Sequence, residues 1–339
     1  MSIKQKIGNF FIKNSNSYNF YKSQYEKHLK NKKIDASVEE QFHDLKNDFN
    51  EFKAVANGQI ESTNFLFKTI FLDYELNQPK GVLKYIQDLS FELLVFVSNI
   101  CEKYHIEWWL DYGSLLGAVR HGDFIPWDDN IDIGMTRKEY LKFIKCLSDE
   151  INHYNLNNFL KLDYKTYELK NDLINTHAQI LIISDENDLV LATLDVLPYD
   201  FSKNKISKKN YNNAKVQFLT DSHNSDLDEC LKNYYEKYDL TFENSALLIS
   251  GIENNYENSK PLIFNSDKIF PLEDIEFKYK NFPCPNNTFY YLKALYDNYM
   301  VIPVNLRRNS KVDSFRYNKN NETLFADALK LLKDINKNI

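Results

Sequence analysis

One segment, residues 108–135, constrains this chain more than any other. All three tryptophans and four of the eight glycines fall inside it, together with a run of acidic residues. Glycine serves where a backbone must turn sharply or approach another group closely. Carboxylates beside such a backbone predict a place where a metal ion and a phosphate are held.

Composition limits the classes to which the protein can belong. A chain of 339 residues, 43% hydrophobic and 15% aromatic, can bury a real core as one large domain with additions, or as two domains. Its net charge of −6 argues against a nucleic-acid binder, which normally shows a basic surface. An acidic protein that handles phosphates needs a metal ion or a local basic group.

The four cysteines are widely spaced, with no CxxC pair, which indicates reduced thiols. Residues 1–21 are polar and do not resemble a signal peptide. No run approaches the roughly 20 apolar residues of a transmembrane helix. We expect a cytoplasmic protein without a transmembrane segment, free or at the inner face of the membrane.

The pattern along the chain predicts three parts. Residues 1–80 form a helical extension with an amphipathic helix over 38–52, residues 81–310 a catalytic domain, and residues 311–339 a C-terminal helix. Within the catalytic domain, residues 203–260 are predicted to be an insertion of helices and loops. The other expected elements are a buried helix over 81–104, a strand over 106–110, a turn into a short helix over 113–119, a strand over 128–135, a helix over 140–147, a β-hairpin over 179–196, and extended or looped structure over 261–310.

The acidic run has a spacing that suits a metal. On a strand alternate residues share a face, so Asp128, Asn130 and Asp132 would project together. Two carboxylates and an amide suit Mg²⁺ or Mn²⁺. Upstream, Gly113 and Ser114 open a helix whose backbone N–H groups can hold a phosphate. A Gly-Ser turn followed by acidic residues on a strand is typical of nucleotidyltransferase-type sites.

Two further carboxylates compete for a place in the site. Asp195 lies in an apolar strand, where a carboxylate needs a partner. It can complete the metal site, act as general base toward an acceptor hydroxyl, or form a buried ion pair. Asp200 is the alternative third carboxylate, and it can equally cap a helix.

Three residues between the Gly-Ser turn and the acidic run are candidates for substrate contacts. Arg120 can grip a phosphate in a bidentate manner and stabilise developing charge, or it can pair with a nearby aspartate. Trp127 can stack on a base or face a quaternary ammonium group, or it can belong to the core. His121 can contact substrate or be an ordinary loop histidine.

The segment 112–133, YGSLLGAVRHGDFIPWDDNIDI, resembles the signature of the LicD family, relatives of the fukutin-type phosphotransferases. Residues 194–200 and 270–296 resemble later motifs of the family. The resemblance implies an α/β class with a small, mixed, nucleotidyltransferase-like sheet flanked by helices. It also implies metal binding by Asp128 and Asp132, with Asp195 as the third carboxylate.

The resemblance further implies transfer of a phospho-alcohol group, such as phosphocholine from CDP-choline, to a hydroxyl of a glycan that is free or lipid-linked. The family has a carboxylate where Asn130 stands, an acidic residue where Lys278 stands, and Gly-Asp where Asp297 and Asn298 stand. Two rivals remain: a metal-dependent glycosyltransferase that uses a nucleotide-sugar, and a non-catalytic binding protein that lost turnover through Asn130.

Overall fold

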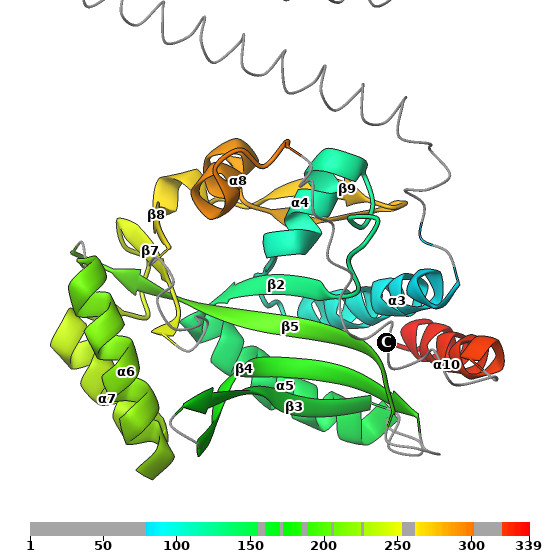
Figure 1. Ribbon diagram of the computed structural model, residues 1–339, viewed down its shortest axis with the longest axis horizontal. Helices are drawn as coiled ribbons and strands as arrows, with labels where there is room; N and C mark the ends of the chain where they lie inside the picture. The colour runs from blue at the N-terminus through cyan, green and yellow to red at the C-terminus, as the bar shows by residue number, and fades with distance from the viewer. Residues whose placement is uncertain are drawn as a thin grey trace, which may run out of the picture. The chain divides into compact units, whose positions relative to one another are not determined.

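The main sheet has strands of mixed direction, and its central path runs β1–β2–β5–β4–β3 (Figure 1). The structure is a computed structural model that describes residues 79, 81–154, 160–169, 172–184, 189–204, 207–224, 227–252, 262–301 and 321–339. The path strands are β1 (Trp109–Leu110), β2 (Ile131–Thr136), β5 (Leu189–Ser202), β4 (Asp172–Ser184) and β3 (Leu160–Leu169). Strands β2 and β5 run parallel and the other neighbours on this path antiparallel. The predicted α/β class with a mixed sheet is confirmed.

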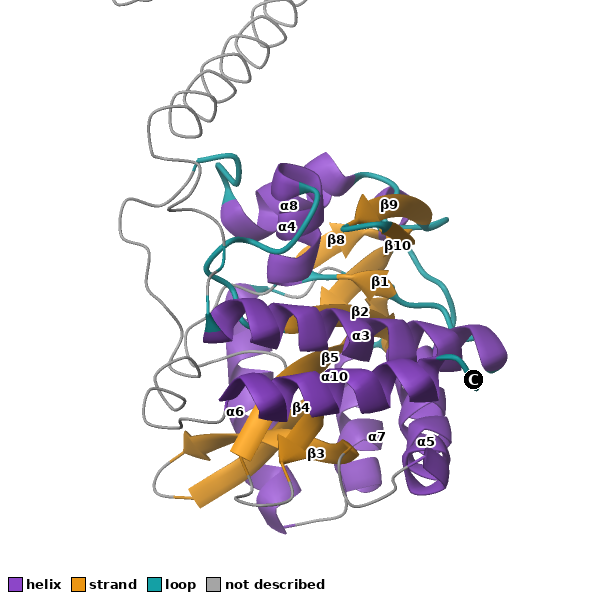
Figure 2. Ribbon diagram, turned by 90° about the vertical axis from the view of Figure 1, so that its right-hand side faces the viewer, coloured by secondary structure: helices purple, strands orange, loops and turns teal. Residues whose placement is uncertain are grey.

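Three helices cover one face of this sheet: α3 (Val82–Lys103), α5 (Arg137–Tyr154) and α10 (Asn321–Asn336). Helices α3 and α10 run side by side across the strands (Figure 2). The apolar residues of α3 recur on most of its sides, and Ile86, Leu93 and Phe96 are fully buried. The predicted buried helix and the predicted C-terminal helix are both confirmed.

The predicted strand over 128–135 is wrong for its first three residues, because β2 begins only at Ile131. Before it, the N–H of Asp128 donates to the carbonyl of Ile125 at 2.9 Å, and the Asp128 carboxylate accepts from the N–H of Asp129 at 3.0 Å. The first of these bonds closes a turn over residues 125–128. Asp128 therefore reaches the site from the end of a turn, whereas Asn130, two residues before Asp132, lies on the same side as Asp132, as the predicted alternation expects.

The insertion is less purely helical than its composition predicts. Helices α6 (Lys208–Asn224) and α7 (Leu227–Tyr238) are present. However, β6 (Leu240–Thr241) and β7 (Leu247–Ser250) follow them and pair with the end of β5, and β8 (Ile263–Asn265) pairs with β7. The short apolar run of β7 joins the sheet because β5 extends beyond the hairpin and offers it an edge.

Several smaller predictions have clear outcomes. The hairpin is confirmed as antiparallel β4 and β5. The strand over 106–110 shortens to β1, and the helix over 140–147 is the middle of α5. Residues 261–310 hold a separate hairpin of β9 (Glu273–Phe277) and β10 (Lys280–Cys284), and also a helix, α8 (Thr288–Tyr296), that was not predicted.

The domain boundaries stay predictions. All described residues belong to one compact unit, Phe65–Ile339. The predicted N-terminal extension, including its helix over 38–52, lies outside the described residues except for residue 79.

Candidate active site

The Gly-Ser turn begins helix α4 (Tyr112–His121), which stands at the start of β2. Asp111 caps this helix by accepting from the N–H of Tyr112 at 2.7 Å. Its own N–H donates to the carbonyl of Asp132 at 3.0 Å. The hydroxyl of Ser114 accepts from the N–H of Asp132 at 2.8 Å. These contacts tie the helix start to the acidic strand, so Ser114 serves as a structural link as well as a candidate phosphate contact.

Gly113 lies directly against the acidic cluster. A Cβ atom at this position would stand 2.6 Å from Oδ2 of Asp128 and 3.6 Å from Oδ2 of Asp132. The first distance is too short for a Cβ atom unless the Asp128 carboxylate moves, so glycine is what leaves that carboxylate in its place. The two carboxylates converge on the backbone at the N-terminal end of α4, where anions are favoured.

Asn130 lies between Asp132 and Asp195. Its amide nitrogen donates to Oδ1 of Asp132 at 3.1 Å and to Oδ2 of Asp195 at 3.0 Å. The amide oxygen accepts from the hydroxyl of Thr193 at 2.6 Å. Asp132 and Asp195 are themselves register partners on the parallel strands β2 and β5. The structure thus gathers the predicted residues Asp128, Asn130, Asp132 and Asp195 into one cluster, through the turn and the β2–β5 pairing.

Asp195 is 2% exposed and is surrounded by nitrogen groups. Its register partner on β4 is Gln179, whose amide donates to Oδ1 at 2.5 Å. Nε2 of His177 lies 3.6 Å from Oδ2. Gln179 and His177 were missed from the sequence; Gln179 opens the predicted hairpin, whereas His177 lies before it, on the part of β4 that was not predicted. A buried carboxylate needs such partners, and here the neighbouring strand supplies them.

Asp200, the alternative third carboxylate, belongs to a different structure. It is fully buried and accepts from Nε of Arg137 at 2.8 Å and from the hydroxyl of Tyr235 at 2.5 Å. This ion pair joins α5, β5 and α7. Between the two alternatives, the fold brings Asp195 to the cluster and places Asp200 in the core.

Arg120, His121 and Trp127 lie next to one another. The guanidinium of Arg120 lies 5.9 Å from the centroid of the Trp127 ring and donates to the carbonyl of Tyr299 at 2.9 Å. The Trp127 and His121 rings meet edge to face at 6.2 Å. Burial, and then the charge of Arg120, lower the pKa of His121 to about 4, so its imidazole is neutral at pH 7. Arg120 pairs with no aspartate in these contacts, and its predicted role toward phosphate stays a prediction.

A buried polar network under the Gly-Ser turn was missed from the sequence. Asp111 is fully buried and accepts from the hydroxyls of Tyr199 at 2.6 Å and Tyr291 at 2.8 Å. Burial raises the pKa of Asp111 to about 6, although both hydroxyls favour its charged form. Nε1 of Trp109 donates to Tyr291 at 3.2 Å. No local sequence pattern predicts this network, because its members come from separate parts of the chain.

Asp128 and Asp132 are the carboxylates of the cluster that could bind a metal ion. In the described part of the chain, no group of three or more His, Cys, Asp or Glu side chains is arranged as a metal site. Mg²⁺, however, binds proteins through one or two carboxylates and completes its shell with water and substrate phosphates. The converging carboxylates beside the start of α4 fit that mode of binding.

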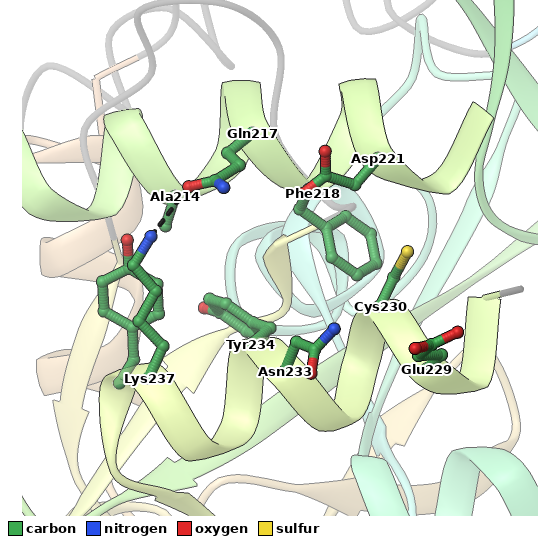
Figure 3. Close-up of a pocket in the computed structure, with 10 residues that line it drawn as sticks. Ala214, Gln217, Phe218, Asp221, Glu229, Cys230, Asn233, Tyr234 and Lys237 are labelled. Atoms are coloured by element: carbon green, nitrogen blue, oxygen red, sulfur yellow. Dashed lines mark hydrogen bonds between the residues drawn. The ribbon is translucent and has the colours of Figure 1, made fainter. Parts of the chain in front are cut away.

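One pocket lies away from this cluster, between α6 and α7 (Figure 3). It has a volume of about 170 Å³, and its lining includes Phe218, Cys230 and Tyr234. None of the predicted site residues lines it. The functional predictions therefore concern the open cluster at α4 and β2 rather than this cavity.

The fold and the cluster together define a nucleotidyltransferase-type domain. A family model described as the nucleotidyltransferase domain of LicD, FKTN and FKRP matches residues 105–287, just over half of the chain. The chain belongs to this LicD family. The predicted family resemblance is thereby confirmed.

Two kinds of curated relatives match shorter segments. A lipopolysaccharide cholinephosphotransferase LicD of Haemophilus influenzae is 41% identical over 78 residues, 23% of this chain and 29% of the relative. The ribitol 5-phosphate transferases FKRP of Mus musculus and Homo sapiens are each 50% identical over 40 residues, 12% of this chain and 8% of the relative. The matches thus span less than a third of each relative's length. None of the described helices is long and apolar enough to cross a membrane.

Proposed function

We propose that the protein is a metal-dependent transferase that moves a phospho-alcohol group from a CDP-activated donor to a hydroxyl of a glycan. The observation that carries the proposal is the contact of Gly113 with Asp128 and Asp132, which places two carboxylates beside the start of α4. The relatives are named for transfer of choline phosphate and ribitol 5-phosphate, and this supports the reaction class.

In this proposal each part of the cluster has a role. Asp128 and Asp132 hold Mg²⁺ or Mn²⁺, which would neutralise charge on the donor phosphates. The backbone N–H groups at the start of α4 bind a phosphate oxygen. Phosphoryl transfer needs mainly positioning and electrostatic stabilisation, so few other groups are required. Arg120, in the last turn of α4, and Trp127, directly before Asp128, are assigned to contacts with the rest of the donor.

Asp195 takes a supporting role in the proposal. It is buried and accepts hydrogen bonds at both oxygens, one of them from Asn130. We therefore assign it to positioning Asn130, in place of the ligand or general-base roles expected from the sequence.

A thermal-shift panel tests the proposal directly. CDP-choline, CDP-ethanolamine, CDP-glycerol, CDP-ribitol and UDP-sugars are each added with and without Mg²⁺. A ligand at about 100 times its dissociation constant stabilises a fold by roughly 2.7 kcal/mol. We expect a metal-dependent shift with one CDP compound, followed by CMP release when a glycan acceptor is added.

Other results of the panel would support a rival. A shift with UDP-sugars alone would favour the glycosyltransferase, and no shift at all would favour the non-catalytic binding protein. Asp132→Asn is the matched control, because it keeps the shape of the side chain and removes its charge. We expect this variant to unfold as the wild type does, to lose the metal-dependent shift and to lose turnover.

A further inference from the structure

Asp132 is the central carboxylate of the cluster, with Asp128 on one side and Asp195 on the other, so a cation could be held between either pair. Oδ2 of Asp132 points toward Gly113, as does Oδ2 of Asp128. Oδ1 of Asp132 points the other way, toward Asn130 and Asp195. A central carboxylate flanked by two others is the arrangement with which proteins hold two cations about 4 Å apart.

The second of these positions is filled by an amide. The nitrogen of Asn130 lies 3.1 Å from one carboxylate oxygen and 3.0 Å from the other, and each amide hydrogen serves one of them. Carboxylates only accept, so these contacts turn the nitrogen toward Asp132 and Asp195 and the oxygen toward the hydroxyl of Thr193. The Asn130 oxygen therefore faces the hydroxyl of Thr193, and its nitrogen lies between the carboxylates of Asp132 and Asp195.

The surroundings of Asp195 agree with this arrangement. Its other oxygen accepts from Gln179 at 2.5 Å, and the ring of His177 stands 3.6 Å away. Two carboxylates on neighbouring strands repel each other unless something compensates their charge. Here the neutral amides of Asn130 and Gln179 donate hydrogen bonds that stabilise both carboxylates and reduce the need for a cation between Asp132 and Asp195.

We infer that Asn130 closes the second cation position, so that this protein binds one divalent cation, between Asp128 and Asp132. The inference rests on the proposed function, since it assumes that the cluster binds a metal. It goes beyond the proposed function because it states that one cation binds and that Asn130 is the residue that limits the number to one.

The test counts Mn²⁺ ions bound to the full chain after treatment with EDTA, from the free Mn²⁺ signal in electron paramagnetic resonance. We expect one ion per wild-type chain and two per Asn130→Asp chain, because the new carboxylate replaces a donor with a ligand. Asn130→Asp combined with Asp195→Asn should return the number to one. Thr193→Val, which removes the bond to the Asn130 oxygen without adding charge, should leave it at one.

If Asn130→Asp does not fold, two single variants still test the inference. Asp195→Asn in the wild-type background should keep the one ion, and Asp128→Asn should lose it. Loss of the ion in Asp195→Asn would overturn the inference, as would two ions in the wild type or one ion in a folded Asn130→Asp. These results leave the proposed function standing, whereas no bound ion in the wild type would overturn both the inference and the proposed metal dependence.

Discussion

At the scale of single residues, Gly113 is where the backbone and the carboxylates meet. Asp128, at the end of a turn, crowds the place of its missing side chain, and Asp132, on a strand, lies at ordinary contact distance from it. The position therefore has little tolerance for added volume. Gly122, in the same segment, differs from it: its φ is +65°, and a Cβ there would meet nothing within 4 Å.

This contrast yields a matched pair of substitutions. Gly113→Ala should lower kcat/KM by about 100-fold, because the methyl group displaces Asp128 from its place beside α4. Gly122→Ala should cost about 1 kcal/mol of stability through backbone strain and leave kcat/KM close to that of the wild type. Steady-state kinetics and urea unfolding of both variants check this. Equal kinetic losses in the two would contradict it.

Asp111 makes stability depend on pH. Because its pKa is raised to about 6 by burial, the folded state binds a proton that the unfolded state releases near pH 4. Stability from this group is fully present below about pH 4 and is lost as pH rises toward 6, by roughly 3 kcal/mol. Asp111→Asn should remove this contribution. Unfolding free energies measured from pH 4 to 7 should therefore fall less steeply with pH in the variant, and parallel curves would refute the assignment.

At the scale of elements, helix α10 belongs to the same core as α3. Phe325 and Leu332 are at most 2% exposed and lie in the main apolar cluster with the residues of α3. The side chain of Asn336 donates to the carbonyl of Glu92 on α3 at 3.0 Å. A helix outside the family match, which ends at residue 287, thus contributes to the covering of the sheet.

Leu332→Ala should therefore destabilise the protein by about 2–5 kcal/mol, the usual cost of removing a buried leucine side chain. Lys330→Ala, on the exposed side of the same helix, should change stability by less than about 0.5 kcal/mol. Urea unfolding measures both. A loss below about 1 kcal/mol for Leu332→Ala would show that α10 docks only loosely.

At the scale of the whole molecule, one buried ion pair connects parts that the sequence separates. Arg137 begins α5, Asp200 lies on β5, and Tyr235 comes from α7 of the insertion. The insertion has its own small apolar cluster around Tyr211 and Phe218. The ion pair and its tyrosine therefore join this cluster to the main core.

Breaking the pair from one side should cost about 3–5 kcal/mol, because it leaves a buried charge without its partner. Asp200→Asn removes one charge, and Arg137→Met removes the other. The combination of Arg137→Met with Asp200→Asn should be less destabilising than the sum of the two single changes. A thermodynamic cycle from urea unfolding of these variants checks the coupling, and additive losses would contradict it.

The sequence by itself determined the family, the fold class, the main helices and the identity of the acidic cluster. These depend on local information: the apolar stripe of α3 or α10 appears in adjacent turns, and the motif over 112–133 is contiguous. It also placed the central hairpin, because two apolar runs flank a short polar stretch.

Only the tertiary structure decided how the cluster is connected. Asp128 reaches the cluster from the end of a turn, and Asp195 becomes the neighbour of Asp132 through the pairing of β2 with β5. That pairing joins residues more than sixty positions apart, so no local pattern encodes it. For the same reason the choice between Asp195 and Asp200, like the contacts of Asn130, depended on which strands and helices meet in space.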